Sequence, residues 1–246
     1  YIVRHSDKII VPSEYLRNLV SGWGVLSSKV FVIYNSVEIS TSRKDKNSLR
    51  KELKILPEEK IIISIGRLTK WKGFEAIIDI FPELVKKEPQ LKLIIIGDGP
   101  EWENLELRIN LKVLPSPTAD GLGGLGPVGN AELEDYIALL GKMAHEEIFK
   151  YLRASDVFIL NTGYEGFSHQ LVEALGSGIP VITTSAGGNP EVIKDKENGL
   201  LVAYNDKNAI KEAIELVLSD VELSAKLSEN GIKTAKQFTK KRMLDE

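Results

Sequence analysis

The chain has 246 residues, of which 43% are hydrophobic and 27% charged, an ordinary composition for a globular protein. Its formal net charge of −3 shows no excess of basic residues, which argues against nucleic acid as the main partner. The absence of cysteine excludes disulfides, a cysteine-based zinc site and a cysteine nucleophile, and the three histidines, His5, His145 and His169, lack metal-ligand spacing. No apolar run reaches the roughly 18 residues of a membrane-spanning helix. The chain opens at Tyr1 rather than Met, so we expect further sequence before it.

Short runs rich in Ile, Leu and Val alternate with amphipathic stretches along the chain. The predicted strands are Lys8–Val11, Lys29–Ile33, Ile61–Ile65, Leu91–Ile96, Ile137–Leu140, Val157–Leu160, Val181–Thr183 and Leu200–Val202. The predicted helices are Glu14–Ser21, Phe74–Lys86, Trp102–Arg108, His145–Arg153, His169–Gly176, Pro190–Lys194 and Ala209–Leu218. Nearly continuous apolar strands that alternate with helices indicate a parallel sheet covered on both faces. The sequence therefore predicts an α/β fold with a Rossmann-like, doubly wound parallel sheet.

A polar segment separates the first two strands from the rest. Residues 42–60 contain seven basic and four acidic side chains, and Asn47–Leu53 is a candidate short helix within them. We predict that residues 1–40 are the remnant of an earlier domain, 41–60 a linker, and 61–246 one complete Rossmann-like domain. The alternative is that residues 1–40 supply the first strands of one larger sheet. The basic stretch Gly231–Arg242 is a candidate helix that returns toward the earlier domain, or a solvated basic face.

One long segment, Leu114–Asn130, interrupts this pattern. It reads LPSPTADGLGGLGPVGN and has no hydrophobic period. Its glycine-rich runs resemble phosphate loops only superficially, because no strand precedes them and no helix follows. We predict a surface insertion at the amino ends of the strands, away from the edge where α/β sheets bind ligands.

The first segment with candidate chemistry is Ile61–Gly73, which reads IIISIGRLTKWKG. A buried strand ends in Gly66, where glycine permits a tight turn and close backbone approach. Arg67 and Lys72 follow, directly before a predicted helix. Cations beside a helix N-terminus make a natural diphosphate site. Solvated loop charges are the alternative, and this segment alone leaves both interpretations open.

The second segment, Asp156–Gly176, reads DVFILNTGYEGFSHQLVEALG. A strand runs into a loop with Glu165 and Gly166, and a helix begins near Ser168 and carries Glu173. Backbone amides at that helix start can receive a phosphate, and a carboxylate suits sugar hydroxyls because it accepts two hydrogen bonds. The alternatives are a surface acid in the loop and an ordinary helix residue, although a carboxylate among apolar neighbours is costly unless it is paired.

The third segment, Ile179–Val192, reads IPVITTSAGGNPEV. A strand ends, two glycines follow, and a short helix begins. Asn189 is the predicted cap, with Pro190 at the first helical position. A ligand contact and a well-formed turn without a ligand both remain open here.

These segments together resemble the retaining glycosyltransferases of the GT-B fold, family 4. Glu165-Gly166-Phe167 through Glu173 resembles the E-x7-E motif of that family, and GRLTKWKG resembles its G-R-L-x-x-x-K-G element. GIPVITTSAGGNPEVIKDKENGLLV resembles a further glycine-rich element, and DKIIVPSEYLRNLV…KVFVIYNSVE the end of the N-terminal, acceptor-side domain. The resemblance implies that this chain is the donor-binding half of a glycosyltransferase, inactive alone.

The resemblance also implies roles for individual residues. It implies catalytic roles for Arg67, Lys72 and Glu165, and donor contacts for Gly66, Lys142, Met143, Gly166, Phe167, Ser168, Leu171 and Glu173. In this interpretation Arg67 and Lys72 bind the diphosphate and stabilise the charge on the leaving nucleotide. Glu165 holds the transferred sugar, Glu173 holds the ribose, and the backbone near Gly141–Met143 meets the nucleobase. No bound metal and no cofactor are implied; the donor substrate is expected to be UDP- or GDP-linked.

The implied partners are a nucleotide sugar and a glycan or lipid-linked acceptor, without nucleic acid, in the cytoplasm or at the inner membrane face through the preceding domain. The chain departs from the family at Asn161-Thr162-Gly163-Tyr164, where Pro-Ser is common, and at Ser168-His169-Gln170, where glycine is common. These departures leave the sugar open. A non-catalytic sugar-nucleotide-binding module and another GT-B enzyme, such as an epimerase or a phosphorylase, are the alternative functions, because a fold alone does not choose among them.

Overall fold

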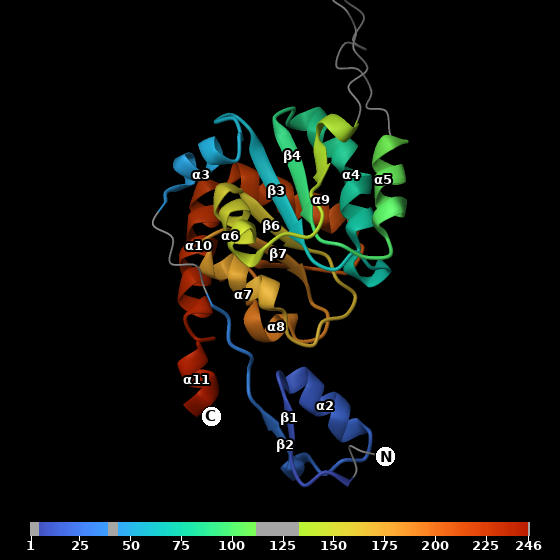
Figure 1. The fold of residues 1–246 in the computed structure, drawn as a ribbon, viewed down its shortest axis with the longest axis vertical. Coiled ribbons are helices and arrows are strands. Elements are labelled where there is room, and N and C mark those ends of the chain that lie inside the picture. Colours follow the sequence, from blue (N-terminus) through green and yellow to red (C-terminus); the bar gives the residue numbers. More distant parts are fainter. Residues whose placement is uncertain (1–4, 39–43, 112–132, 246) are drawn as a thin grey trace, which may run out of the picture.

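The computed structural model describes residues 5–38, 44–111 and 133–245, and its main body is a three-layer α/β structure (Figure 1). A six-stranded parallel sheet with strand order β5-β4-β3-β6-β7-β8 forms the middle layer. The strands are β3 (Lys60–Ile65), β4 (Leu91–Ile96), β5 (Ile137–Leu139), β6 (Val157–Leu160), β7 (Val181–Thr184) and β8 (Leu200–Val202). The predicted doubly wound parallel sheet is confirmed. The predicted insertion Leu114–Asn130 lies outside the described residues.

Helices bury both faces of this sheet. Along β3, Ile61, Ile63 and Ile65 belong to one buried cluster and Ile62 to the other, as the alternation of side chains in a strand requires. The face of Ile62 is covered by α4 (Phe74–Lys87), α5 (Trp102–Asn110) and α9 (Lys207–Ser219). The opposite face is covered by α6 (His145–Ala154) and α7 (His169–Gly176), with α10 (Val221–Ala235) packed against α7. Burial on both faces explains why these strands read as continuous apolar runs.

The strand order reverses between β3 and β6. The chain builds outward from β3 to β4 and β5, returns to the centre at β6, and continues outward through β7 and β8. The loops that follow β3 and β6 therefore leave the sheet in different directions at its carboxyl edge. Such a switch point is where open α/β sheets bind ligands.

The N-terminal segment forms a separate small unit. Strands β1 (Ile9–Val11) and β2 (Val30–Val32) pair in parallel, and α2 (Glu14–Gly22) packs on them around Val20 and Val25. The two strands do not join the six-stranded sheet, so the alternative of one larger sheet is wrong. Figure 1 shows this unit beyond the carboxyl edge of the main sheet, below α8. The predicted domain boundaries remain predictions.

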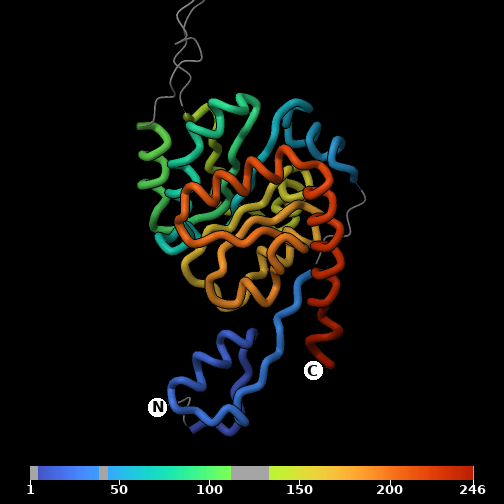
Figure 2. Tube along the Cα trace, turned by 180° about the vertical axis from the view of Figure 1, so that it is seen from behind, coloured from blue at the N-terminus to red at the C-terminus, as the bar shows by residue number. Residues whose placement is uncertain are grey.

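Two further segments pack onto the main body. The predicted linker contains α3 (Lys46–Glu52), whose N-cap is Asp45 and which packs against α6. At the other end of the chain, α10 is followed by α11 (Lys240–Asp245), and the backbone N–H of Val37 donates to the carbonyl of Phe238 at 3.0 Å. Figure 2 shows this C-terminal stretch beside the segment that connects the small unit to the main body. Helix α10 begins immediately after α9, with Asp220 as its N-cap, so it starts ten residues before the predicted C-terminal helix Gly231–Arg242.

Candidate functional site

The loops after β3 and β6 are fastened to each other at the carboxyl edge. Gly73 has φ +58°, and a Cβ atom there would lie 2.3 Å from Nδ2 of Asn161, so only glycine fits. The side-chain amide of Asn161 donates to the carbonyl of Gly73 at 2.8 Å, and the N–H of Gly163 donates to the carbonyl of Trp71 at 2.7 Å. The carboxyl edge therefore presents both loops as one connected surface.

This connection brings two of the predicted catalytic residues into contact. Nζ of Lys72 donates to Oε2 of Glu165 at 2.5 Å, and the two side chains are only 11% and 16% exposed. The aliphatic part of the Lys72 side chain passes beside Gly66: a Cβ atom on Gly66 would lie 3.8 Å from Cδ and Cε of Lys72. The fold thus brings Lys72 and Glu165, which come from two separate sequence motifs, into direct contact.

A cavity of about 540 Å³ opens at the ends of β3, β4 and β5 and includes Gly66, beside which the Lys72 stem runs; neither Lys72 nor Glu165 is among its lining residues. It is lined by Ile65, Gly66, Arg67, Ile96, Gly97, Asp98, Gly99, Lys142, Met143, Ile148 and Gln170. Four predicted site residues are thus brought together: Gly66 and Arg67 from the first motif, and Lys142 and Met143 after β5. Arg67 is exposed, so its guanidinium is accessible to an anion at this edge.

The loop after β4 was not predicted as part of the site. A Cβ atom on Gly97 would lie 1.8 Å from the carbonyl oxygen of Gly66, and one on Gly99 would lie 2.4 Å from that of Leu68. The carbonyl of Asp98 accepts the N–H of Leu68 at 2.9 Å, which holds the two loops together. The available signal was the Gly-Asp-Gly sequence directly after a buried strand, at the carboxyl edge where ligands bind.

The start of α7 matches the predicted residues only partly. Ser168 caps the helix, and its hydroxyl accepts the N–H of Leu171 at 3.3 Å. The side chains of Leu171 and Phe167 are buried in the core, Phe167 against Tyr34 and Phe238, so they do not line the cavity. Any contact of these two residues with a donor is left to the backbone.

Glu173 lies one turn beyond Gln170 on α7 and has a partner that sequence reasoning missed. Its Oε1 is 2.7 Å from Nε2 of His145, the first residue of α6, and its side chain is 12% exposed. The His145 ring also meets the edge of Phe149 at a centroid distance of 4.9 Å. The sequence signal that could have identified His145 was a titratable side chain directly after the loop that follows β5. Glu173 is thus held by a partly exposed imidazole rather than left alone among apolar neighbours.

The two glycines of the third motif support the backbone of Glu165. Gly187 has φ +59°, and a Cβ atom there would lie 1.9 Å from the carbonyl oxygen of Glu165. The N–H of Gly188 donates to that same oxygen at 2.8 Å. The predicted cap is off by one residue, because Gly188 is the N-cap of α8 (Asn189–Val192). The side-chain amide of Asn189 instead donates to the carbonyl of Thr184 at 3.1 Å.

Asn161 and Thr162, where the chain first departs from the family pattern, make hydrogen bonds within the fold. Asn161 ties Gly73 to Asn205, since its Nδ2 donates to both, and its Oδ1 accepts the N–H of Asn205 at 3.0 Å. The hydroxyl of Thr162 donates to the carbonyl of Tyr164 at 2.8 Å. Asn161 and Thr162 are both buried, so they shape the loop rather than face the cavity.

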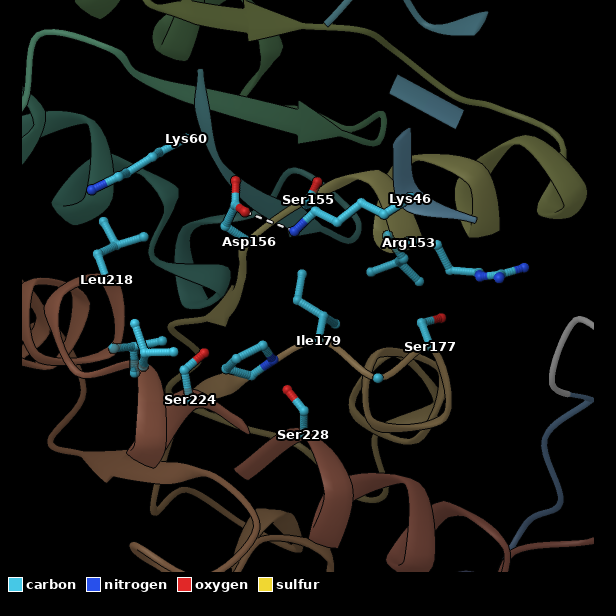
Figure 3. Close-up of a pocket in the computed structure, with 15 residues that line it drawn as sticks. Lys46, Lys60, Arg153, Ser155, Asp156, Ser177, Ile179, Leu218, Ser224 and Ser228 are labelled. Atoms are coloured by element: carbon cyan, nitrogen blue, oxygen red, sulfur yellow. Dashed lines mark hydrogen bonds and ion pairs between the residues drawn. The ribbon is translucent and has the colours of Figure 1, made fainter. Parts of the chain in front are cut away.

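A second cavity lies at the opposite, amino edge of the sheet. It measures about 270 Å³ and is bordered by α9 and α10, with Lys46, Asp156, Ser224 and Ser228 among its lining residues (Figure 3). Lys46 points at Asp156, and the two form an ion pair of 2.7 Å. None of the predicted site residues lines it. Within residues 5–38, 44–111 and 133–245, no group of three or more His, Asp or Glu side chains could hold a metal ion.

A doubly wound parallel sheet with a cavity and cationic loops at its switch point defines a Rossmann-like nucleotide-binding fold. The family model described as glycosyl transferases group 1 matches residues 59–220, and the chain belongs to this family. The predicted family is thereby confirmed, while its narrower assignment to family 4 stays a prediction. In the described part of the chain, no helix combines the length and the apolar composition that crossing a bilayer requires.

The chain is similar to several glycosyltransferases. It is 28% identical over 230 residues to N-acetyl-alpha-D-glucosaminyl L-malate synthase of Bacillus anthracis, covering 93% of this chain and 55% of that protein. It is 30% identical to alpha-monoglucosyldiacylglycerol synthase of Streptococcus pneumoniae, covering 89% of this chain and 46% of that protein. The chain spans about half the length of these curated relatives.

Solved structures agree on the fold. A crystal structure of Anabaena Alr3699/HepE in complex with UDP superimposes with a TM-score of 0.81 at 24% identity, covering 98% of this chain and 62% of that one. The complex of the same protein with UDP-glucose gives a TM-score of 0.80 at 23% identity, covering 98% and 64%. The six-stranded parallel sheet flanked by helices is the architecture of these GT-B neighbours.

Proposed function

We propose that this chain supplies the nucleotide-sugar site of a retaining glycosyltransferase that transfers a sugar to a glycan or lipid-linked acceptor. The observation that carries the proposal is the Lys72–Glu165 contact beside the cavity that Arg67 lines. The names of its relatives support a transferase, and the UDP and UDP-glucose complexes of a structural neighbour support a nucleotide sugar as the ligand.

The proposed donor lies across the switch point. Its nucleobase occupies the cavity at Lys142 and Met143, and its ribose hydroxyls bind Glu173, which His145 holds in place. The diphosphate lies against Arg67 and Lys72, whose positive charge offsets the negative charge that grows on the leaving nucleotide. Cationic side chains here do the work that a metal ion does in other enzymes, and no cofactor is proposed.

Glu165 is proposed to bind hydroxyls of the transferred sugar. One of its carboxylate oxygens accepts from Lys72, and a carboxylate has further acceptor positions for sugar hydroxyls. Retention of configuration follows if the acceptor attacks the face from which the diphosphate departs. A cleft enzyme orients both substrates before it accelerates transfer, so we propose that the acceptor binds residues outside this chain, at the inner membrane face when the acceptor is lipid-linked.

Calorimetry with UDP, GDP and ADP tests the proposal. We expect one of them to bind, and Arg67→Ala to weaken that binding by about 1.5–3 kcal/mol if the bond to diphosphate is charge-assisted. The matched control is Lys236→Ala, which removes an exposed positive charge from the C-cap of α10. Absence of binding by all three nucleotides, or an equal loss in both variants, would reject the assigned site.

A further inference from the structure

Glu191 on α8 connects the main body to the small N-terminal unit. Its Oε2 accepts the backbone N–H of Glu14 at 2.8 Å, and its Oε1 accepts that of Tyr15 at 2.8 Å. The hydroxyl of Tyr34 donates to the same carboxylate at 2.8 Å. One side chain of the main body therefore holds three donors that precede it in sequence by more than 150 residues.

These contacts complete the cap of α2. The first N–H groups of a helix have no partners inside it, and the positive end of the helix dipole favours an anion there. Ser13, which is fully buried, caps the N–H of Leu16 at 3.2 Å, and Glu191 takes the two amides before it. Capping by a carboxylate from another part of the chain fixes both the position and the direction of α2.

The surface next to Glu191 is the loop that carries Glu165. A Cβ atom on Gly166 would lie 2.9 Å from Cδ1 of Leu16, so the loop and α2 are in close contact. Tyr15 meets the ring of Tyr164 edge-on at a centroid distance of 6.1 Å. The N-terminal unit thus rests on the residues immediately on either side of Glu165.

The other support of Glu165 leads back to Glu191. The N–H of Gly188, three residues before Glu191, donates to the carbonyl of Glu165 at 2.8 Å. The turn that begins α8 therefore holds Glu165 with its backbone and α2 with its side chain. A shift of α2 acts on Glu165 through two contacts, this turn and the Gly166 loop.

We propose that Glu191 is a positioning residue: its carboxylate clasps the amino end of α2 and so holds Glu165 in place for the sugar of the donor. The effect on the donor sugar rests on the proposed function. The three hydrogen bonds that Glu191 accepts from Glu14, Tyr15 and Tyr34, called the clasp below, are a property of the folded chain. The surrounding charges are compatible with it, because Glu14 pairs with Arg17 at 2.7 Å and Arg242 lies over the Tyr34 ring at 5.7 Å.

A distance measurement tests the clasp. The chain has no cysteine, so Ser28→Cys in the N-terminal unit and Asn208→Cys in the main body, both exposed, accept spin labels specifically. We expect a narrow label–label distribution in the parent, a clearly broader one with Glu191→Ala, and an intermediate one with Glu191→Gln, whose amide oxygen still accepts an N–H. Glu197→Gln, an exposed glutamate six residues on, is the control and should match the parent.

Calorimetry separates positioning from folding. Because Glu165 is assigned to the sugar, we expect Glu191→Ala to lower the affinity for the nucleotide sugar by about fivefold, the size of one hydrogen bond, while the free nucleotide binds within about twofold of the parent. Equal losses for both ligands, or a parent-like distance distribution, would overturn the positioning role. If the alanine variant does not fold, Glu191→Gln decides by the same two measurements.

The two proposals fail in different ways. A parent chain that binds no nucleotide rejects the donor site, while the distance distributions still accept or reject the clasp. A parent chain that binds nucleotide normally but shows no effect of Glu191→Ala on the distances rejects the clasp alone.

Discussion

The two edges of the main sheet each carry an ion pair where β3 and β6 meet, and the pairs differ in how completely they are bonded. At the amino edge, Arg50 donates to Asp156 at 2.6 Å and to the carbonyls of Ala154, Pro57 and Glu59. Asp156 also accepts from Lys46 and from the N–H of Ile61. At the carboxyl edge, the described contact of the Lys72 ammonium is Glu165 alone.

A structural ion pair differs from a ligand-binding one in how many donors and acceptors it leaves unused. The Arg50 guanidinium already donates to three carbonyls and a carboxylate, so it has few donors left for a ligand. The Lys72 ammonium has three donors and the Glu165 carboxylate has several acceptor positions, so this pair can still bind a ligand. The amino-edge cavity of Figure 3 fits this view, because Lys46 and Asp156 on its wall pair with each other. Of the two edges, as far as the structure describes them, the carboxyl edge combines charge, glycines that permit close approach and remaining hydrogen-bonding capacity.

The sharpest way to break this comparison is to remove Arg50. Arg50→Met keeps the apolar stem but leaves Asp156 and the carbonyls without their buried donor, and breaking such a pair costs about 3–5 kcal/mol. We expect the free energy of unfolding in urea to fall by that amount, with nucleotide affinity unchanged. The control is Lys51→Met on the exposed side of α3. A loss of nucleotide affinity comparable to that in Arg67→Ala would remove the distinction between the two edges.

The reciprocal change is made at Lys72. Lys72→Met should weaken nucleotide binding by about 1.5–3 kcal/mol, the value of a hydrogen bond between charged groups, because it removes a cation from the diphosphate position. It should destabilise the fold less than Arg50→Met does, since fewer bonds are lost. The neighbouring Lys70→Met, exposed in the same loop, serves as the comparison in calorimetry and urea denaturation. Lys72→Met with parent-like affinity would leave the carboxyl-edge pair as structural as the amino-edge pair.

A glycine substitution tests whether the carboxyl edge depends on close backbone approach. Gly187→Ala forces a side chain into φ +59° and against the carbonyl of Glu165, and a non-glycine residue in that conformation costs about 1–3 kcal/mol. We expect a lower unfolding midpoint and weaker nucleotide-sugar binding. Gly22→Ala, where no atom lies within 4 Å of the added methyl group, should change neither. Indistinguishable alanine variants would show that the turn does not constrain Glu165.

The smallest expected effect is at the contact between the two units. Burial, with the hydrogen bond to Glu191, raises the pKa of Tyr34 to about 12, above the value near 10 of an unfolded chain. Since the unfolded chain loses this proton first, the stability that Tyr34 contributes is full below about pH 10 and is lost as pH rises toward 12. Tyr34→Phe should cost about 1 kcal/mol at pH 7 and flatten the decline of stability between about pH 10 and 12. An equally steep decline in the variant would contradict this assignment, although Tyr151, whose pKa burial also raises, keeps some slope in both.

The α/β class, the parallel sheet and the segments that form its carboxyl edge follow from the amino-acid sequence alone. Apolar runs and turn residues are local signals, so the eight strands and the loops with Arg67 and Glu165 could be placed along the chain. The cap of α8 was misplaced by one residue, because the backbone of Gly188 bonds the carbonyl of Glu165. The first turns of α10 were missed although Asp220, a common N-cap residue, precedes them.

Which groups from distant parts of the chain meet depends on the three-dimensional fold. Lys72 and Glu165 are 93 residues apart, His145 and Glu173 are 28 apart, and Glu191 and Glu14 are 177 apart. The first two pairs form because strand order brings loops or helix ends together, and the third forms because the N-terminal unit packs against α8. No local period in the sequence encodes either arrangement. Asp98 and His145 carried a local signal, their position in or directly after a loop that follows a strand, whereas the role of Glu191 depends on partners that the fold supplies.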